Sequence, residues 1–96
     1  MSEPKKYAHM GEVVRVLRQA AGLTRMQLGQ GTKVGTLALR DIELRRRLPT
    51  RAQLDQLLKA PAMADLIALC ELEGVPVELA PGPGSNPGGD PSGPSN

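Results

Sequence analysis

The chain has 96 residues and one cysteine, so it can form one compact domain but no internal disulfide and no cysteine-based zinc site. It has neither a membrane-spanning run of apolar residues nor a signal-like N-terminus, which predicts a cytoplasmic protein. The net charge of +2 is unevenly distributed, because residues 1–59 carry all 12 Lys and Arg with five acids, whereas residues 60–96 carry five acids and no base.

This uneven charge bears on the kind of partner. A basic surface suits a polyanion, because neutralised phosphates release their condensed counterions, whereas an acidic surface is repelled by the same polyanion. Only the first part of the chain therefore suits nucleic acid. The alternative is ordinary solvated charge.

The two ends of the chain differ from its middle. Residues 81–96 consist almost entirely of Pro, Gly, Ser and Asn, so a disordered tail is expected there. Residues 1–8 are expected to form a flexible N-terminus. In residues 9–80 apolar residues recur at helical rather than alternating spacing, which predicts one all-α domain.

The first helix is expected from about His9 to Ala21. Its apolar side carries Val13, Val14, Leu17 and Ala21. Arg15, Arg18 and Gln19 lie on the other side of the helix. Gly22 follows, and glycine adopts the left-handed conformation that ends a helix without steric penalty.

A second helix is expected to begin after Thr24, whose hydroxyl can accept from the free N–H groups of the first turn. Leu28 is its buried anchor. Gly29 and Gly31 each weaken a helix by about 0.5–1 kcal/mol relative to alanine. This helix is therefore expected to be short and held by tertiary contacts.

A turn at residues 32–34 leads to a third helix, which is expected over about residues 36–44. Gly35 is its expected N-cap, and Leu39 and Ile42, three residues apart, are expected to point inside.

The remaining elements follow a basic connection at residues 45–49, which ends in a proline that cannot continue a helix. Thr50 is expected to cap a fourth helix over residues 51–59. A fifth helix is expected over residues 62–73, with Gly74 at its end. Five helices and no strand are thus predicted.

Residues 24–44 have the spacing of two short helices joined by a tight turn, each with buried aliphatic side chains and a free polar face, which is typical of a helix-turn-helix. The fixed positions are Leu17-Arg18, Gly22-Leu23-Thr24, Leu28, Val34, Leu39, Ile42-Glu43 and Pro49-Thr50. Through these residues the chain resembles the Cro and lambda-repressor-type helix-turn-helix family. Residues 69–79 also look like the end of that family's last core helix.

The resemblance implies a five-helix domain whose third helix enters the major groove of DNA while the second lies across the phosphate backbone. It places Thr36, Leu37 and Asp41 where the family reads base edges, with Arg40 between them. It also places Arg25 at a position that contacts phosphate.

Chemistry assigns different contacts to these residues. Arg40 could hold guanine O6 and N7 through two hydrogen bonds, and Thr36 could donate to a phosphate or contact a thymine methyl group. Leu37 can make only an apolar contact with that methyl group. Asp41 could accept from a cytosine amine, or could instead pair with Arg45 on the protein surface.

The run Arg45, Arg46 and Arg47 stands where the resemblance implies that a loop approaches the phosphate backbone. The alternative for this run is a solvated turn. Lys33 is a further candidate phosphate contact. It also stands where the family commonly has glycine, and a left-handed conformation there costs about 1–2 kcal/mol, so the turn could be reshaped.

The resemblance further implies an ion pair between Arg18 and Glu43, for which the alternative is two solvated charges. Residues 55–65 exceed what a minimal member of the family needs, and could either enlarge the core or form a dimer surface. A homodimer would place two recognition helices about 34–36 Å apart and imply a palindromic operator.

No catalytic residues, metal site or cofactor are expected. His9 has no nearby cysteine, histidine or acidic cluster, and Cys70 has no evident base beside it. Tyr7 is the only aromatic residue, which argues against single-stranded nucleic acid as a target.

The sequence therefore predicts a bacterial or phage regulator that binds double-stranded DNA sequence-specifically and represses transcription by occupying an operator. The alternative is a protein-interaction module of the same fold, an anti-activator or an antitoxin, that binds a second regulatory protein or a toxin. Its surface would be Leu37, the apolar face of the third helix, or the acidic C-terminal half.

Overall fold

A computed structural model describes residues 7–81 of the chain, in which all regular structure is helical. The elements are α1 (Met10–Ala20), α2 (Arg25–Thr32), α3 (Thr36–Glu43), α4 (Arg51–Leu58), the 3-10 helix η1 (Pro61–Met63) and α5 (Leu66–Glu73). The prediction of an all-α domain is confirmed for these residues. The predicted tail lies, apart from Pro81, outside the described residues. None of the helices described is both long and apolar enough to cross a bilayer.

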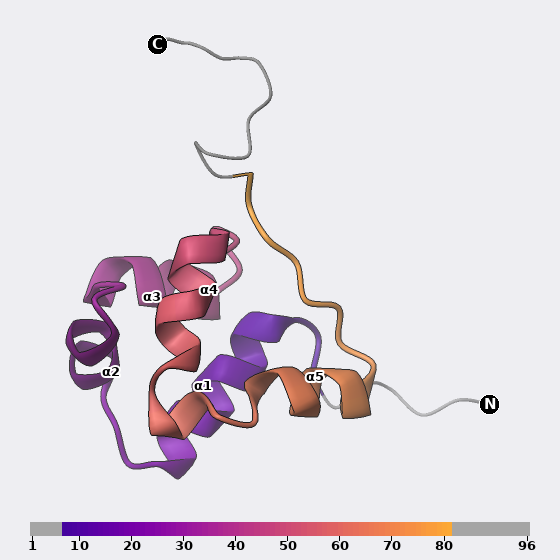
Figure 1. The fold of residues 1–96 in the computed structure, drawn as a ribbon, viewed down its shortest axis with the longest axis horizontal. Coiled ribbons are helices and arrows are strands. Elements are labelled where there is room, and N and C mark those ends of the chain that lie inside the picture. Colours follow the sequence, from indigo (N-terminus) through magenta and orange to yellow (C-terminus); the bar gives the residue numbers. More distant parts are fainter. Residues whose placement is uncertain (1–6, 82–96) are drawn as a thin grey trace, which may run out of the picture.

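The helices are arranged around α1, which packs against α3, α5 and η1. α2 packs chiefly on α3, so these two helices form one end of the domain while α5 lies at the other (Figure 1). The buried apolar side chains come from every helix and are Tyr7, Met10, Val13, Val14, Leu28, Leu39, Ile42, Leu54, Leu57, Met63, Leu66, Cys70 and Val75. Full burial of one aliphatic side chain contributes about 1.5–3 kcal/mol, so this set provides the main driving force for folding.

Two threonines begin helices as predicted. The hydroxyl of Thr24 accepts a hydrogen bond from the Gln27 N–H at 3.0 Å, and the Gln27 side chain accepts from the Thr24 N–H at 2.9 Å. Thr50 and Gln53 form the same reciprocal pair at 3.1 and 3.0 Å. Each arrangement satisfies two N–H groups that a helix terminus would otherwise leave free, a contribution of about 1 kcal/mol.

Two glycines end helices as predicted. Gly22 follows α1 with φ 74°, and the N–H of the next residue, Leu23, donates to the Arg18 carbonyl at 3.1 Å. This is the hydrogen bond of a Schellman motif. Gly74 ends α5 in the same left-handed region, with φ 70°.

The predicted fifth helix over residues 62–73 is wrong in its first part. Residues 61–63 form η1, a turn follows at Ala64 and Asp65, and α5 begins only at Leu66. Met63 and Leu66 are both fully buried. Side chains three residues apart share a face in both an α-helix and a 3-10 helix, so apolar spacing does not reveal this break.

The N-terminal boundary also differs from the prediction. Tyr7 is only 7% exposed and belongs to the core, and the Ala8 N–H donates to the Glu12 carboxylate. The predicted flexible N-terminus is therefore wrong for residues 7 and 8, because the tyrosine ring buries a large apolar area against the helices. Residues 1–6 lie outside the described part of the chain.

Candidate nucleic-acid interface

α2 and α3 approach closely at Gly29. A Cβ atom at this position would lie 2.8–2.9 Å from backbone atoms of Gly35 and Thr36, closer than real Cβ contacts come. The Gly35 N–H donates to the Gly29 carbonyl at 3.0 Å across this approach. The sequence does not reveal this role, because the close approach involves Gly35 and Thr36 of a different segment and local spacing does not record it.

The turn between α2 and α3 places Lys33 in the left-handed region, with φ 64° and ψ 9°. Lys33 thus adopts the glycine-like conformation itself, at a cost of about 1–2 kcal/mol. Its side chain is exposed. The buried hydroxyl of Thr32, just before it, donates to the Leu28 carbonyl at 2.7 Å and so ties the end of α2 to its own backbone.

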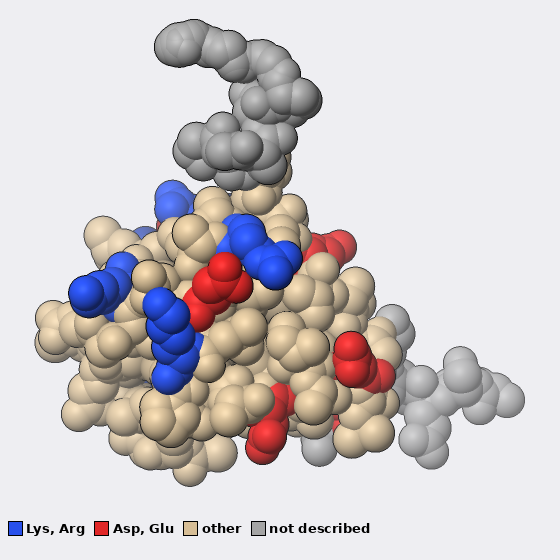
Figure 2. Space-filling model, viewed as in Figure 1, with Lys and Arg blue, Asp and Glu red and all other residues tan. Residues whose placement is uncertain are grey.

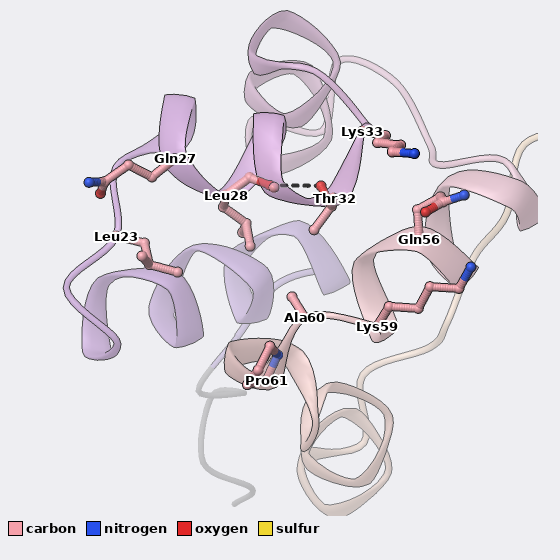
Figure 3. A pocket seen from close by; sticks show the side chains of 10 residues that line it. Leu23, Gln27, Leu28, Thr32, Lys33, Gln56, Lys59, Ala60 and Pro61 are labelled. Carbon is pink, nitrogen blue, oxygen red and sulfur yellow. Dashed lines mark hydrogen bonds between the residues drawn. The ribbon is translucent and has the colours of Figure 1, made fainter.

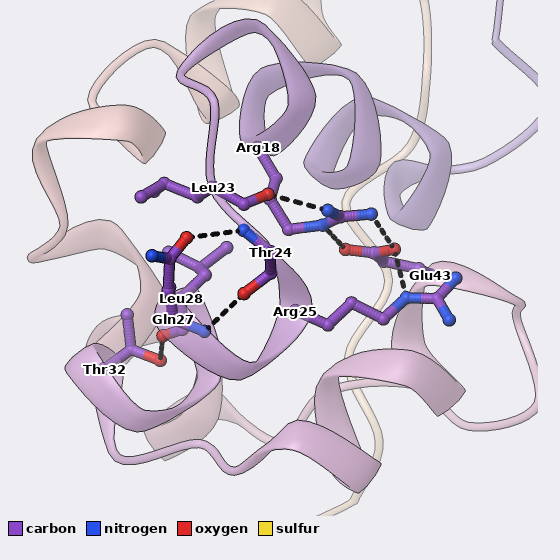
Figure 4. A network of polar contacts seen from close by, with 8 residues as sticks. All are labelled: Arg18, Leu23, Thr24, Arg25, Gln27, Leu28, Thr32 and Glu43. Atoms are coloured by element: carbon purple, nitrogen blue, oxygen red, sulfur yellow. Dashed lines mark hydrogen bonds and ion pairs between the residues drawn. The ribbon is translucent and has the colours of Figure 1, made fainter.

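A buried carboxylate joins α1, α2 and α3 (Figure 4). The Glu43 side chain is fully buried and accepts from Arg18 at 2.7 and 3.1 Å and from Arg25 at 2.9 Å. Arg18 also donates to the Leu23 carbonyl at 2.8 Å. Bidentate, charge-assisted hydrogen bonds such as those from Arg18 to Glu43 fix the relative orientation of the two side chains and also stabilise the fold.

The structure therefore contains the ion pair expected between Arg18 and Glu43. Arg18 is only 8% exposed, so the alternative of two solvated charges does not hold. Its guanidinium can be buried because it is neutralised by the carboxylate and donates to it twice. Arg25, predicted to contact phosphate, uses its Nε for Glu43, and its side chain keeps 32% of its surface exposed. Its two terminal Nη groups form no hydrogen bond within residues 7–81 and can donate outward.

The four residues predicted to read bases all belong to α3 and differ in exposure. Leu37 is 66% exposed, and Thr36 is half-buried. The Arg40 and Asp41 side chains are 42% and 21% exposed and approach each other at 3.6 Å. The Arg40 Nε is buried and has no hydrogen-bond partner among the described residues, so its terminal nitrogens are the donors available outside.

Asp41 organises the loop that follows α3. Its carbonyl accepts from the Arg46 and Arg47 N–H groups at 2.8 and 3.3 Å, and its carboxylate lies 3.9 Å from the Arg47 guanidinium. The expected alternative pair of Asp41 with Arg45 is not formed. Arg45 adopts a left-handed conformation, φ 59°, which turns its side chain to Glu78 at 3.3 Å.

Arg46 is exposed and has no acidic partner in the part of the chain that the structure describes. Arg45 and Arg47 do have such partners, of which the Glu78 side chain is 41% exposed and the Asp41 side chain 21%. An exposed pair such as Arg45–Glu78 contributes only about 0–1 kcal/mol, so a phosphate can replace Glu78 at little cost.

The charge asymmetry expected from the sequence persists in the folded domain. Residues 24–51, which include α2, α3 and the arginine loop, carry seven bases and two acids, a net charge of +5. One of these acids, Glu43, is fully buried. On the face drawn in Figure 2, the basic side chains all lie over the half containing α2, α3 and α4, with an acidic side chain between them, and the surface over α5 shows only acidic ones.

Two further observations concern chemistry other than DNA binding. Among the described residues, no three His, Cys, Asp or Glu side chains are grouped so as to hold a metal ion. Burial raises the pKa of the Cys70 thiol, which keeps it protonated and weakly nucleophilic.

Comparisons with protein-family models, curated proteins and solved structures find no match for this chain.

Proposed function

We propose that the chain is a helix-turn-helix protein that binds duplex DNA, with α2 and α3 as the two helices of the motif. The observation that carries this proposal is the exposed outer side of α3, with Leu37 and Arg40, flanked by Lys33 on one side and the arginine loop, residues 45–47, on the other. An α-helix fits the major groove, and basic side chains on both sides of the helix would then meet the phosphates that border the groove.

The division of labour follows from the chemistry of the side chains. Arg40 offers terminal donors to guanine, and Leu37 an apolar contact to a thymine methyl group. Thr36 and Asp41 stand beside them with less exposed surface. Base contacts of this kind give sequence specificity, and the protein then acts by occupying an operator and repressing transcription.

The phosphate contacts are assigned to exposed Lys and Arg side chains around α3. Lys33 and Arg46 are exposed without an acidic partner among the described residues. Arg45 can exchange the exposed Glu78 carboxylate for a phosphate, and Arg47 is half exposed and lies 3.9 Å from the Asp41 carboxylate, so its guanidinium can also reach a phosphate. Arg25 is held by Glu43 with its terminal nitrogens free to donate. Such contacts set position and affinity and carry no sequence information.

A homodimer on a palindromic operator is part of the proposal. Within the 55–65 segment, Leu57 and Met63 are fully buried in the monomer and enlarge its core. Leu72 of α5, 80% exposed, is an apolar side chain that a second copy could cover.

Measured salt dependence of DNA binding tests the phosphate contacts. Arg46→Ala is expected to reduce the slope of log K against log salt by about 0.9, since each lost contact releases one fewer condensed counterion. The loss should be similar for all sequences, because phosphate contacts do not read bases. The assay is fluorescence anisotropy with genomic fragments, including the one upstream of the protein's own gene, at several salt concentrations.

Arg15→Ala is the matched control, because Arg15 is an exposed arginine of α1 outside the proposed interface and should leave the slope unchanged. Equal slopes for Arg46→Ala and Arg15→Ala would contradict the phosphate role.

One observation favours the alternative of a protein-interaction module. Leu37 is the most exposed of the four residues proposed to read bases, and Met26 of α2 is 57% exposed. Exposed apolar side chains of this size suit a protein partner such as a second regulator or a toxin. The same assay separates the two functions, since an interaction module would not bind DNA even at low salt.

A further inference from the structure

A pocket of about 480 Å³ opens between α2 and the end of α4 (Figure 3). Its size is within the range of about 300–1,000 Å³ typical of small-molecule sites. It lies beside the proposed DNA-binding surface and shares Lys33 with it.

The pocket has an apolar part and a polar part. Leu23, Leu28 and Pro61 supply apolar surface. In Figure 3, the polar ends of Lys33, Gln56 and Lys59 lie together on one side of the pocket, away from Leu23.

The charge of this polar side is uncompensated. No Asp or Glu lines the pocket, and neither Lys33 nor Lys59 forms an ion pair within residues 7–81. Two ammonium groups and one amide are donors suited to a carboxylate. A neutral ligand would leave the ammonium groups unused, and a bare inorganic anion would leave the apolar wall uncovered.

The pocket owes part of its space to Gly31. This glycine lies one turn after Gln27 and Leu28 on the face of α2 that lines the pocket, and a Cβ atom built there would meet nothing within 4 Å. A longer side chain at this position would therefore occupy the pocket without disturbing the packing of α2. This makes Gly31 the natural site for a blocking substitution.

We propose that this pocket binds a small apolar carboxylate, with its hydrocarbon part against Leu23, Leu28 and Pro61 and its carboxylate between Lys33 and Lys59. The ligand would be an effector of the protein. Because Lys33 is also a proposed phosphate contact, a carboxylate bound to it removes one contact from the duplex. This last step alone rests on the proposed function.

Direct titration tests the site without DNA. Octanoate is the probe, octanol is its neutral counterpart, and the readout is isothermal calorimetry together with amide chemical shifts. We expect octanoate to bind in the millimolar range, as is usual for a ligand with so few non-hydrogen atoms, and octanol to bind more weakly. The shifted amides should lie on α2 and at the end of α4.

Three variants sharpen the test. Lys59→Gln should weaken octanoate binding about tenfold, as expected for loss of a charge-assisted hydrogen bond, and leave octanol binding unchanged. Gly31→Leu should abolish binding of both. Arg15→Gln removes an exposed charge elsewhere and should change neither.

The outcomes decide the proposal whatever the DNA result. Absence of octanoate binding, or equal binding of octanoate and octanol in both the native protein and Lys59→Gln, would overturn it. If Gly31→Leu does not fold, as judged by circular dichroism, Lys59→Gln still decides. Failure to bind DNA would leave the titration unaffected, because no duplex is present in it.

Discussion

Glu43→Gln is expected to lower the free energy of unfolding by about 3–5 kcal/mol, the range for breaking a buried ion pair by removing one partner. The Glu43 carboxylate is fully buried and neutralises Arg18, which is itself only 8% exposed, and it also accepts from Arg25. Glutamine keeps the shape but removes the charge, so the Arg18 guanidinium would be left buried without a counter-charge. Urea denaturation followed by circular dichroism measures the change.

Asp55→Asn is the matched control for this substitution. Asp55 pairs with Arg51 at 3.4 Å, but the two side chains are 55% and 78% exposed. Exposed pairs of this kind contribute less than about 1 kcal/mol. A loss for Glu43→Gln no larger than that for Asp55→Asn would show that the Glu43 network does not hold the three helices together.

Gly29→Ala and Gly11→Ala are each expected to destabilise the domain by about 1–3 kcal/mol, as overpacking of a close contact does. A Cβ at Gly29 would collide with the backbone of Gly35 and Thr36, and one at Gly11 would collide with the Ile42 carbonyl oxygen. Backbone atoms cannot move aside as the end of a flexible side chain can. The urea midpoints of the two variants report the effect.

Gly31→Ala should have the opposite sign. Gly31 is in the same helix as Gly29, but its Cβ would face open space, so alanine should stabilise α2 by about 0.5–1 kcal/mol through helix propensity alone. If Gly29→Ala were as stabilising as Gly31→Ala, the close packing of α2 on α3 would be contradicted.

The sequence predicts the local features of this fold well. The starts of α2 and α4 and the ends of α1 and α5 were predicted from Thr24, Thr50, Gly22 and Gly74, because caps act on backbone groups within a few residues. The burial of Leu28, Leu39 and Ile42 follows from their helical spacing, whereas Ala21, predicted on the apolar side of the first helix, is exposed.

Features that depend on residues far apart in sequence were not predicted. Gly29 and Gly11 matter because other segments come close to them, and no local pattern records such an approach. The sequence does not predict the contact of Arg25 with Glu43, because the two residues are 18 positions apart and meet only in the folded domain. Asp41 and Arg45 stand at the spacing of partners on a helix, but the chain leaves the helix between them, after Glu43.

The same distinction applies to the candidate site. The sequence predicts α3 and the basic residues beside it as the candidate site, because their spacing and charge are local properties. It did not predict that carboxylates of the chain itself lie beside Arg40, Arg45 and Arg47. These pairs arise from the fold of the loop after α3 and from the return of the chain near Glu78.

The central claim, that the outer side of α3 and its flanking bases face a duplex, is tested most directly by amide chemical shifts of the labelled protein during titration with a short DNA duplex at low salt. The account predicts shifts concentrated at residues 33–47 and at the start of α2, weakening as salt is added. Shifts confined to α5, or no shifts at low salt, would contradict it.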